Sequence, residues 1–439
     1  MRFIINNFRD KLNSNRLLAV ARPDPAAPML LGAQVMFNIG FYAVVPFLAI
    51  VLADDFLLGG AAVGLVLGIR TFSQQGMFLI GGMMSDRLGA KTVILVGCGV
   101  RAAGFLTLSA SLWPEHPSLP PFIAGTVLTG LGGAMFSPAL NTLVSAAEAH
   151  RGSRRGRSIS LFAWLVALGE VGAAIGPLVG AALFGWGFVV VAVTGAALFT
   201  AIAVILWRFL PSQPRARRGG ARGERRAAPA LRDRRFVAFA VIHAVDLLAY
   251  NQLYLSFPTE LRRVGAGAPA LGLIFAWVSV LTILLQLPVS RWSNRFPPAT
   301  TLRIGYLSSA CGFLVLAICA PWPPPVGWAL GPAFAAVTLL ALGHLFAVPT
   351  ALGAVSSFSG TRQTGSYFGL LATTGGIAVL LGNLGIGALL DAAAAPRPSA
   401  VLPWLVLAAL STSSALLVGS RWIWSRPASG DSGSIAFRS

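Results

Sequence analysis

The sequence predicts an all-α integral membrane protein with twelve transmembrane helices in two pseudo-symmetric six-helix halves. Hydrophobic residues make up 56% of its 439 residues, charged residues make up 11%, and the mean hydropathy is +0.75. This composition excludes an ordinary water-soluble globular protein. Twelve stretches reach the roughly 20 apolar residues that a spanning helix needs, and together they leave no room for a separate soluble domain.

The predicted spans divide the chain into an N-terminal half, residues 28–210, and a C-terminal half, residues 236–424. A segment of residues 1–27 precedes the first half, a linker rich in Arg, Pro, Gly and Ala at 211–235 joins the halves, and a tail follows at 425–439. The individual spans are predicted at 28–53, 61–83, 92–112, 121–145, 158–184, 187–210, 236–258, 270–292, 301–321, 330–352, 365–391 and 400–424.

Positive charge is distributed unevenly among the predicted loops. With the N-terminus in the cytoplasm, the inside segments hold 28 of the 33 Lys and Arg residues and the outside loops hold three. Cytoplasmic loops carry such an excess, so we expect both termini and the linker to be cytoplasmic. An anionic membrane surface also attracts such segments. The net charge of +19 therefore requires no nucleic-acid partner.

Two halves of equal size indicate an internal duplication. Residues 85–88 (Ser-Asp-Arg-Leu) match residues 293–296 (Ser-Asn-Arg-Phe) at an offset of 208, each between the second and third spans of its half. Residues 176–178 on the fifth span correspond to residues 382–384 on the eleventh. Duplicated transporter halves of this kind bind substrate between them near the midplane and rock against each other.

Ionisable side chains inside the spans are candidates for function, because they are costly in lipid. Asp246 and His243 are three residues apart and share a helix face, which Tyr250 extends by one turn. A carboxylate there can take up a proton from one side of the membrane and release it to the other. Glu170 is the second such acid. We therefore expect proton coupling at Asp246, Glu170 and His243.

Other polar and aromatic side chains within the spans could line a substrate cavity. Arg70, with Gln74 one turn later, forms a polar face that could meet either an anionic substrate group or a carboxylate. An alternative role for Glu170 and Asp246 is to pair with Arg101 or Arg70 and fix helix positions. A lone histidine on an apolar face is more often a hydrogen-bonded core residue. The cavity candidates are Arg70, Gln74, Arg101, Asn38, Tyr250, Tyr254, Trp164, Trp277 and His344.

The fifth span and the turn after the second span contain glycine motifs. Gly172, Gly176 and Gly180 lie at four-residue spacing, which lets helix backbones approach closely in lipid, and Pro177 bends the helix. A plain packing seam would explain the glycine spacing alone. The polar turn at 82–91 includes Gly82, Asp86, Arg87, Gly89 and Lys91 and lies where the chain leaves the bilayer.

These two motifs resemble those of the major facilitator superfamily. Residues 82–91 match its G-x-x-x-D-R-x-G-x-K loop, and residues 172–180 resemble the G-x-x-x-G-P-x-x-G run of its drug/proton antiporter branch. The resemblance implies the twelve-helix superfamily fold and proton-driven export, with residues 82–91 as a conformational gate latch. Further stretches resemble the MdtH-type bacterial multidrug exporters, namely residues 67–70, 74–76, 101–105, 130–133, 234–237, 290–293 and 365–367.

The chain departs from that pattern at three positions. Drug antiporters commonly carry an arginine in the fourth span where this chain has Thr126, so Arg101 or Arg70 would have to replace it unless its role is absent. The first span lacks the acid that some multidrug members use, and Asn38 is its most polar residue. In the second copy of the latch, Asn294 replaces the acid, so only the N-terminal half can form the charged latch.

These patterns predict a proton-coupled secondary transporter of the bacterial inner membrane that exports amphipathic small molecules by alternating access. Alternatives are a transporter dedicated to one metabolite, such as a siderophore, peptide or sugar, and, more remotely, a non-transporting receptor or scaffold. Residues 130–133 lack the Lys-Ser/Thr of a P-loop, and no nucleophile motif occurs, so we expect no enzyme activity. We also expect no metal or cofactor, a monomer, and no partners beyond substrate, protons and lipids.

Overall fold

The computed structural model consists of helices and their connections. All regular structure in the described residues is helical, and twelve helical spans are long and apolar enough to cross a membrane. The predicted all-α class with twelve spans is therefore confirmed. The N-terminal segment before Ala26, most of the 211–235 linker and the tail after Trp424 lie outside the described residues, which are 26–112, 117–150, 161–210, 229–293, 295–322, 328–359, 364–393 and 397–424.

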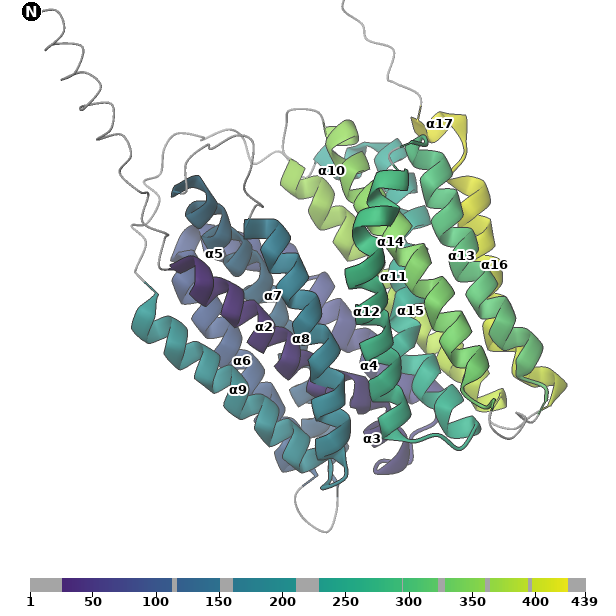
Figure 1. Ribbon diagram of the computed structural model, residues 1–439, viewed down its shortest axis with the longest axis horizontal. Coiled ribbons are helices and arrows are strands. Elements are labelled where there is room, and N and C mark those ends of the chain that lie inside the picture. Colours follow the sequence, from purple (N-terminus) through teal and green to yellow (C-terminus); the bar gives the residue numbers. More distant parts are fainter. Residues whose placement is uncertain are drawn as a thin grey trace, which may run out of the picture.

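The N-terminal half contains the first six spans (Figure 1, purple to teal). The first span is built from α2 (Ala26–Val44), the 3-10 helix η2 (Val45–Phe47) and α3 (Leu48–Asp54), and the second from α4 (Gly60–Gln75) and α5 (Phe78–Leu88). The remaining four are α6 (Ala90–Ser111), α7 (Leu119–His150), α8 (Leu161–Phe184) and α9 (Phe188–Phe209).

The C-terminal half contains the other six spans, with a short helix on either side. These spans are α11 (Arg234–Arg263), α12 (Ala268–Ser293), α13 (Pro298–Cys319), α14 (Gly331–Ser359), α15 (Thr364–Ala392) and the pair η3 (Pro398–Val401) and α16 (Leu402–Leu417). The short flanking helices are α10 (Pro229–Arg232) and α17 (Arg421–Trp424).

The observed spans differ from the predicted ones at several places. The first span is interrupted at Pro46, which has no N–H for the helical ladder, and the second is interrupted after Gln75. Helix α11 runs five residues beyond the predicted end at 258, because Pro258 is accommodated inside the helix. The last span, which was predicted to end at residue 424, ends at Leu417.

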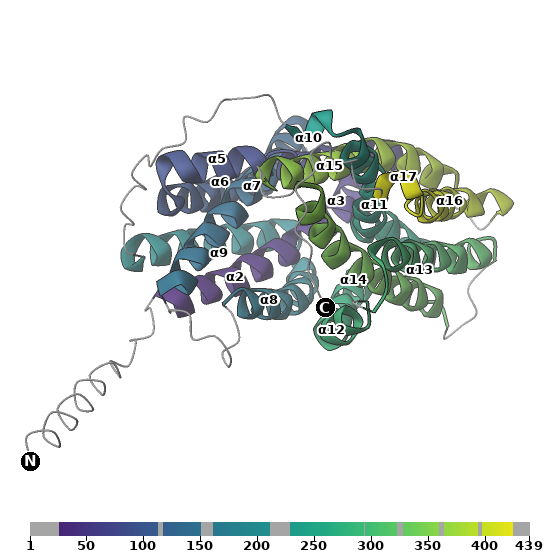
Figure 2. The ribbon, with the colours of Figure 1, turned by 90° about the horizontal axis from the view of Figure 1, so that it is seen from above.

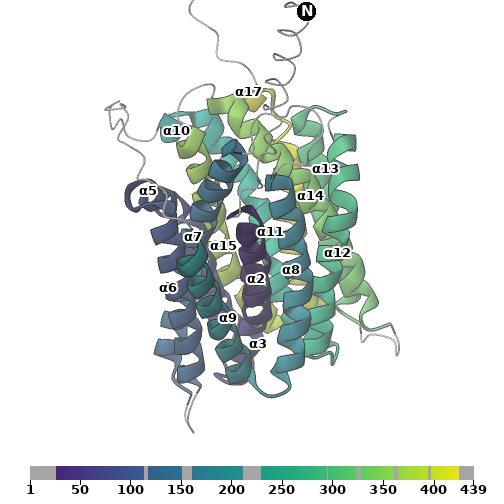
Figure 3. The same ribbon diagram turned by 60° about the vertical axis from the view of Figure 1, so that its left-hand side comes forward.

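The two halves lie side by side, with α3 and α15 near the middle (Figure 2). The spans run roughly parallel from one face of the molecule to the other (Figure 3). One face carries α10, α17 and the turn between α5 and α6, and we call it the basic face. The opposite face carries the end of α3 and the connections 55–59 and 264–267, and we call it the far face. The charge pattern predicts that the basic face is cytoplasmic.

Glycines on α4 bring the two halves into backbone contact. Gly60, Gly64 and Gly68 lie one turn apart and face α15, and a Cβ atom at any of them would overlap α15 backbone atoms. Helices α8 and α12 form a second contact between the halves, where Gly272 lies against the carbonyl of Pro177. Small residues therefore set the distance between the halves, as is usual where helices associate in lipid.

Polar contacts tie the halves together at the far face. The backbone N–H of Gly60 donates to Oδ1 of Asp391, 2.5 Å away at the end of α15. Nη1 of Arg262 at the end of α11 lies 2.5 Å from Oδ1 of Asp54 at the end of α3. Both members of that ion pair are exposed, so its contribution to stability is small.

Candidate functional site

Asp246 and His344 form a buried acid–histidine pair in the C-terminal half. Oδ2 of Asp246 on α11 lies 2.9 Å from Nδ1 of His344 on α14. The ring of Tyr250 stacks on the His344 ring, with 3.9 Å between the centroids. Asp246 is 4% exposed, whereas the His344 side chain is 27% exposed although it lies inside a span. His344 is therefore the more exposed member of the pair.

His243 binds a different partner from Asp246, one turn away on the same helix. Its Nδ1 lies 2.8 Å from the hydroxyl oxygen of Tyr306 on α13, and its ring stacks on Phe239. His243 interacts electrostatically with Asp246 and His344. We call the four residues His243, Asp246, Tyr306 and His344 the His–Asp cluster. The sequence places two of its members on one helix face, and the structure adds the other two from neighbouring helices.

Glu170 approaches the His–Asp cluster from the N-terminal half. It lies seven residues before Pro177 on α8, about 20° away around the helix, and Pro177 faces Gly272 of α12. Glu170 is half-buried and makes no hydrogen bond or ion pair with any residue that the structure describes. It interacts electrostatically with His344 and with the hydroxyl of Tyr250. Glu170 thus interacts electrostatically with the histidine that is hydrogen-bonded to Asp246.

Arg70 lies on α4 at the boundary between the halves and is 4% exposed. Its Nη2 donates to Oε1 of Gln74 at 2.7 Å, and its guanidinium carbon lies 4.7 Å from the centroid of Phe41. It interacts electrostatically with the hydroxyls of Tyr42 on α2 and Tyr254 on α11. None of the described acidic residues forms an ion pair with Arg70. The proposed pairing of Arg70 with Glu170 or Asp246 is therefore not present.

Arg101 lies inside the N-terminal half rather than on its surface toward the other half. It is fully buried, and its guanidinium carbon lies 4.5 Å from the centroid of Phe37 and 5.3 Å from that of Phe199. Its Nε donates to the carbonyl of Thr129 on α7 at 3.0 Å. Thr129 is one turn beyond Thr126, so Arg101 brings a positive charge from α6 to the part of α7 where antiporters carry an arginine.

Asn38 lies at the contact between α2 and α8. Nδ2 of Asn38 donates to the carbonyl of Gly169 at 2.7 Å, directly before Glu170 in the chain. Trp164, two turns earlier on α8, is 45% exposed. Asn38 therefore anchors the turn of α8 that carries Glu170.

The aromatic residues of α12 point in two directions. Phe275 faces the boundary between the halves, with its ring centroid 6.1 Å from that of Tyr42 and 5.1 Å from that of Tyr254. Trp277 lies about 200° further around the helix, and its Nε1 donates to Oγ1 of Thr338 on α14 at 2.9 Å. Phe275, and not the predicted cavity residue Trp277, is therefore the aromatic residue of α12 that contacts Tyr254.

This difference predicts unequal effects of two alanine substitutions on α12. We expect Phe275→Ala to weaken substrate binding about fivefold, because one aromatic contact contributes ~1 kcal/mol. We expect Trp277→Ala to change binding less than about twofold, since its ring points away. Substrate affinity in detergent, with gel filtration to verify folding, measures both. Equal losses in the two variants would contradict this placement of the rings.

The polar turn at 82–91 is tied to its own half. Gly89 ends α5 with φ of +90°, a conformation that favours glycine. The Nζ of Lys91 donates to the carbonyls of Trp207, at 3.1 Å, and Leu210, both near the end of α9. Gly82 has open space where a Cβ would lie, and Arg87 is exposed. The side chain of Asp86, like Asn294 of the second copy, lies outside the described residues, so the latch role stays a prediction.

Lys91→Met is expected to loosen the contact between α6 and α9. The lysine is a cation at the carbonyl end of α9, a favourable position worth about 0.3–1 kcal/mol. We expect the thermal unfolding temperature in detergent to fall by about 1 °C. Lys91→Arg serves as the control, because it retains the charge. An unchanged unfolding temperature for Lys91→Met would contradict a role for these hydrogen bonds.

The glycine seam of α8 packs within the N-terminal half. A Cβ at Gly172, Gly176 or Gly180 would meet the α2 carbonyls of Val35, Ile39 and Ala43, respectively. Pro177 is rotated from this seam and lies at the contact with α12. The glycines of the antiporter-like motif therefore hold α8 to α2, and its proline reaches the other half.

A buried amide network joins α4, α11 and α15. Its residues are not ionisable and were not among the predicted site residues. Nδ2 of Asn251 donates to Oγ1 of Thr71 at 3.2 Å, across the boundary between the halves. Nδ2 of Asn383 donates to Oδ1 of Asn251 at 3.0 Å, and Nε2 of Gln252 donates to Oδ1 of Asn383 at 3.1 Å. The adjacent amides Asn251 and Gln252 in the middle of a predicted span were the available signal.

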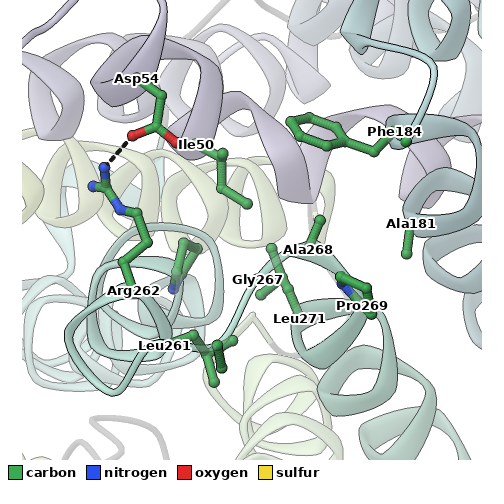
Figure 4. A pocket seen from close by; sticks show the side chains of 13 residues that line it. Ile50, Asp54, Ala181, Phe184, Leu261, Arg262, Gly267, Ala268, Pro269 and Leu271 are labelled. Atoms are coloured by element: carbon green, nitrogen blue, oxygen red, sulfur yellow. Dashed lines mark hydrogen bonds and ion pairs between the residues drawn. The ribbon is translucent and has the colours of Figure 1, made fainter.

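A pocket of about 370 Å³ opens at the far face, between α3 and α8 of one half and α11 and α12 of the other (Figure 4). The Asp54–Arg262 ion pair lies on one side of it, and Phe184 and Pro269 lie on another (Figure 4). This pocket is at the ends of the spans and contains none of the predicted site residues.

Comparison with known proteins agrees with this architecture. The family model described as Major Facilitator Superfamily matches residues 30–383. The chain is 33% identical over 376 residues to the uncharacterized MFS-type transporter Rv0849 of Mycobacterium tuberculosis, covering 82% of this chain and 84% of that protein. It is 30% identical over 408 residues to the multidrug resistance protein MdtH of Escherichia coli, covering 91% of this chain and 94% of MdtH.

Solved transporter structures share the fold at low sequence identity. The nucleoside transporter NupG superposes with a TM-score of 0.70 at 16% identity and covers 92% of this chain and 100% of NupG. A POT family transporter in complex with 5-aminolevulinic acid superposes with a TM-score of 0.72 at 12% identity and covers 91% of this chain and 96% of that structure. At these identities the likeness extends to the fold alone.

Proposed function

Because the chain belongs to the major facilitator superfamily, we propose that this multi-pass membrane transporter exports amphipathic small molecules in exchange for protons. It is a transporter and not an enzyme. The convergence of Glu170 and Asp246 on His344 carries the proposal. These acids belong to opposite halves, so a change in how the halves meet alters the surroundings of both. Such a change is what alternating access requires.

The proposed exchange uses Glu170 and Asp246 as proton carriers. When a site faces the outside, where the proton concentration is higher, an acid takes up a proton and becomes neutral. When the site faces the cytoplasm, the proton is released. The His344 ring, bonded to Asp246 and partly exposed, offers a path for the proton between the buried acid and water. The proton gradient supplies the energy, and no cofactor is required.

Similarity to MdtH favours a multidrug exporter over a transporter of one metabolite. Aromatic rings from both halves offer contacts to flat apolar molecules: Tyr42 and Tyr254 contact Phe275, and Tyr250 stacks on His344. Under this proposal the protein is a monomer in the bacterial inner membrane with its basic face, and both termini, in the cytoplasm. Reporter fusions at residue 439 and in the 55–59 connection test that orientation, and activity of a periplasm-specific reporter at residue 439 would contradict it.

Transport by the full-length protein in proteoliposomes tests the function. A panel of cationic, neutral and anionic fluorescent compounds is added while a pH gradient is imposed across the membrane. We expect several compounds to accumulate against their own gradients and the accumulation to stop when a protonophore removes the pH gradient. Accumulation that does not depend on the pH gradient would contradict proton coupling. Movement of a single metabolite from a broad panel would instead support the dedicated transporter.

A further inference from the structure

We propose that Arg70, with the charge of Arg101 behind it, binds an acidic group of the transported molecule, so that preferred substrates carry a carboxylate, sulfonate or phosphate on an aromatic body. This inference rests on the proposed transport function and names its substrate class. Sequence alone leaves two possible partners for Arg70, an anion of the substrate or a carboxylate of the protein. The structure distinguishes between them.

The acidic residues that could neutralise Arg70 and Arg101 have other charged neighbours. Asp246 is bonded to His344, and Glu260 is bonded to Arg263 at the far-face end of α11. Glu170 interacts electrostatically with His344, and neither arginine is among its charged neighbours. Among the described residues, the two arginines therefore have no counter-charge. Buried cations are costly when unpaired, and an anion from outside the protein would remove that cost.

The two guanidinium groups have several unused hydrogen-bond donors. Of the five N–H groups of Arg70, one nitrogen donates to Gln74, while the buried Nε has no partner in the described residues. Arg101 uses Nε, while its buried Nη1 and Nη2 have no partner there. A planar anion with two oxygens matches this donor pattern, because a guanidinium presents parallel N–H groups to a carboxylate or sulfonate.

Both guanidinium groups lie against the same aromatic ring. The guanidinium carbon of Arg70 is 4.7 Å from the centroid of Phe41, and that of Arg101 is 5.2 Å from it. The two charges interact electrostatically. Nη2 of Arg101 occupies the space beside Gly133. A Cβ atom at residue 133 would overlap that nitrogen. The two positive charges therefore add at one place instead of being distributed over the half.

Arg70 is the member of the pair that lies at the boundary between the halves. It interacts with the hydroxyls of Tyr42 and Tyr254, and both of these rings contact Phe275. Arg101 lies behind it and strengthens the positive potential. A substrate bound with its acidic group at Arg70 would place its aromatic body against Tyr254 and Phe275. The proton carriers Glu170 and Asp246 are separate residues, so anion recognition and proton coupling can be tested independently.

Binding of a matched pair of probes tests the site. The probes are radiolabelled naphthalene-2-sulfonate and the uncharged naphthalene-2-sulfonamide, measured on the purified full-length protein at constant ionic strength. We expect the wild type to bind the sulfonate at least about tenfold more tightly than the sulfonamide. We expect Arg70→Gln to remove this preference while changing sulfonamide affinity less than about twofold, and Arg70→Lys to retain part of it. Arg101→Lys retains the rear charge, so we expect it to keep the preference for the sulfonate.

Three results would overturn the proposal. The first is equal affinity of the wild type for both probes, and the second is an equal loss for both probes in Arg70→Gln. The third is that chloride or inorganic phosphate occupies the site and the sulfonate does not displace it. Arg70 would then belong to a site for inorganic anions. Gel filtration and thermal unfolding verify that each variant is folded. Because these are binding measurements, their failure is distinguishable from a failure of pH-driven transport.

Discussion

Asp246→Asn is expected to abolish accumulation driven by a pH gradient while permitting movement of substrate down its own gradient. Asparagine has the shape of aspartate and can still hydrogen-bond to Nδ1 of His344, so the contact between α11 and α14 is retained. It cannot take up or release a proton. The exchange of a proton for substrate is therefore lost, and we expect pH-driven accumulation to fall at least about tenfold, a change in driving force equivalent to ~1.4 kcal/mol or more.

Glu170→Gln is expected to act in the same direction, because Glu170 is the acid that the N-terminal half contributes near His344. Asp55→Asn is the matched control, since it is also an acid-to-amide change but lies exposed at the far face beyond α3. Uptake into proteoliposomes, with and without an imposed pH gradient, measures all three variants. If both Asp246→Asn and Glu170→Gln accumulate substrate at the wild-type rate, the assignment of proton carriers is wrong.

Composition and charge were sufficient to predict the number of spans and the division into two halves, because each span must satisfy its own length and hydropathy. The same information cannot give contacts between helices. Asp246 and His243 were placed on one face by their spacing, but their partners His344 and Tyr306 come from helices about 100 and 60 residues away along the chain, respectively. These partners depend on how α11, α13 and α14 pack.

The positions of Arg101 and Trp277 illustrate the same limit. Both are polar or aromatic residues within spans, and residue type alone made them cavity candidates. Arg101 instead lies among Phe37, Phe41 and Phe199 inside its half, and Trp277 points toward α14. A helix buries several faces against different neighbours, and residue type does not tell which face meets the other half. In contrast, the glycine motif on α8 was correctly expected to pack closely, although its partner is α2.

Gly64→Leu is expected to prevent the close contact between α4 and α15. The two halves would then be unable to close against each other at the far face. A Cβ at Gly64 would overlap the carbonyl of Asn383, a backbone atom that cannot rotate away. The side chain of Asn383 is fixed by hydrogen bonds to Asn251 and Gln252, so a shift of α15 would also break the amide network. Overpacking of this kind costs about 1–3 kcal/mol or more, which corresponds to roughly a tenfold to hundredfold shift between the two conformations.

The expected result is a transporter that folds, binds lipid and remains in the membrane, but has its far face open. A cysteine introduced at Ile50, which lines the far-face pocket, should then react faster with a membrane-impermeant thiol reagent, and transport should fall at least about tenfold. The native Cys98, Cys311 and Cys319, which are all free thiols, are first replaced by serine. Gly99→Leu is the matched control, because a Cβ at Gly99 meets nothing within 4 Å. Wild-type labelling and transport in Gly64→Leu would show that α4 and α15 need not approach closely, and the far-face contact would then lose its role in alternating access.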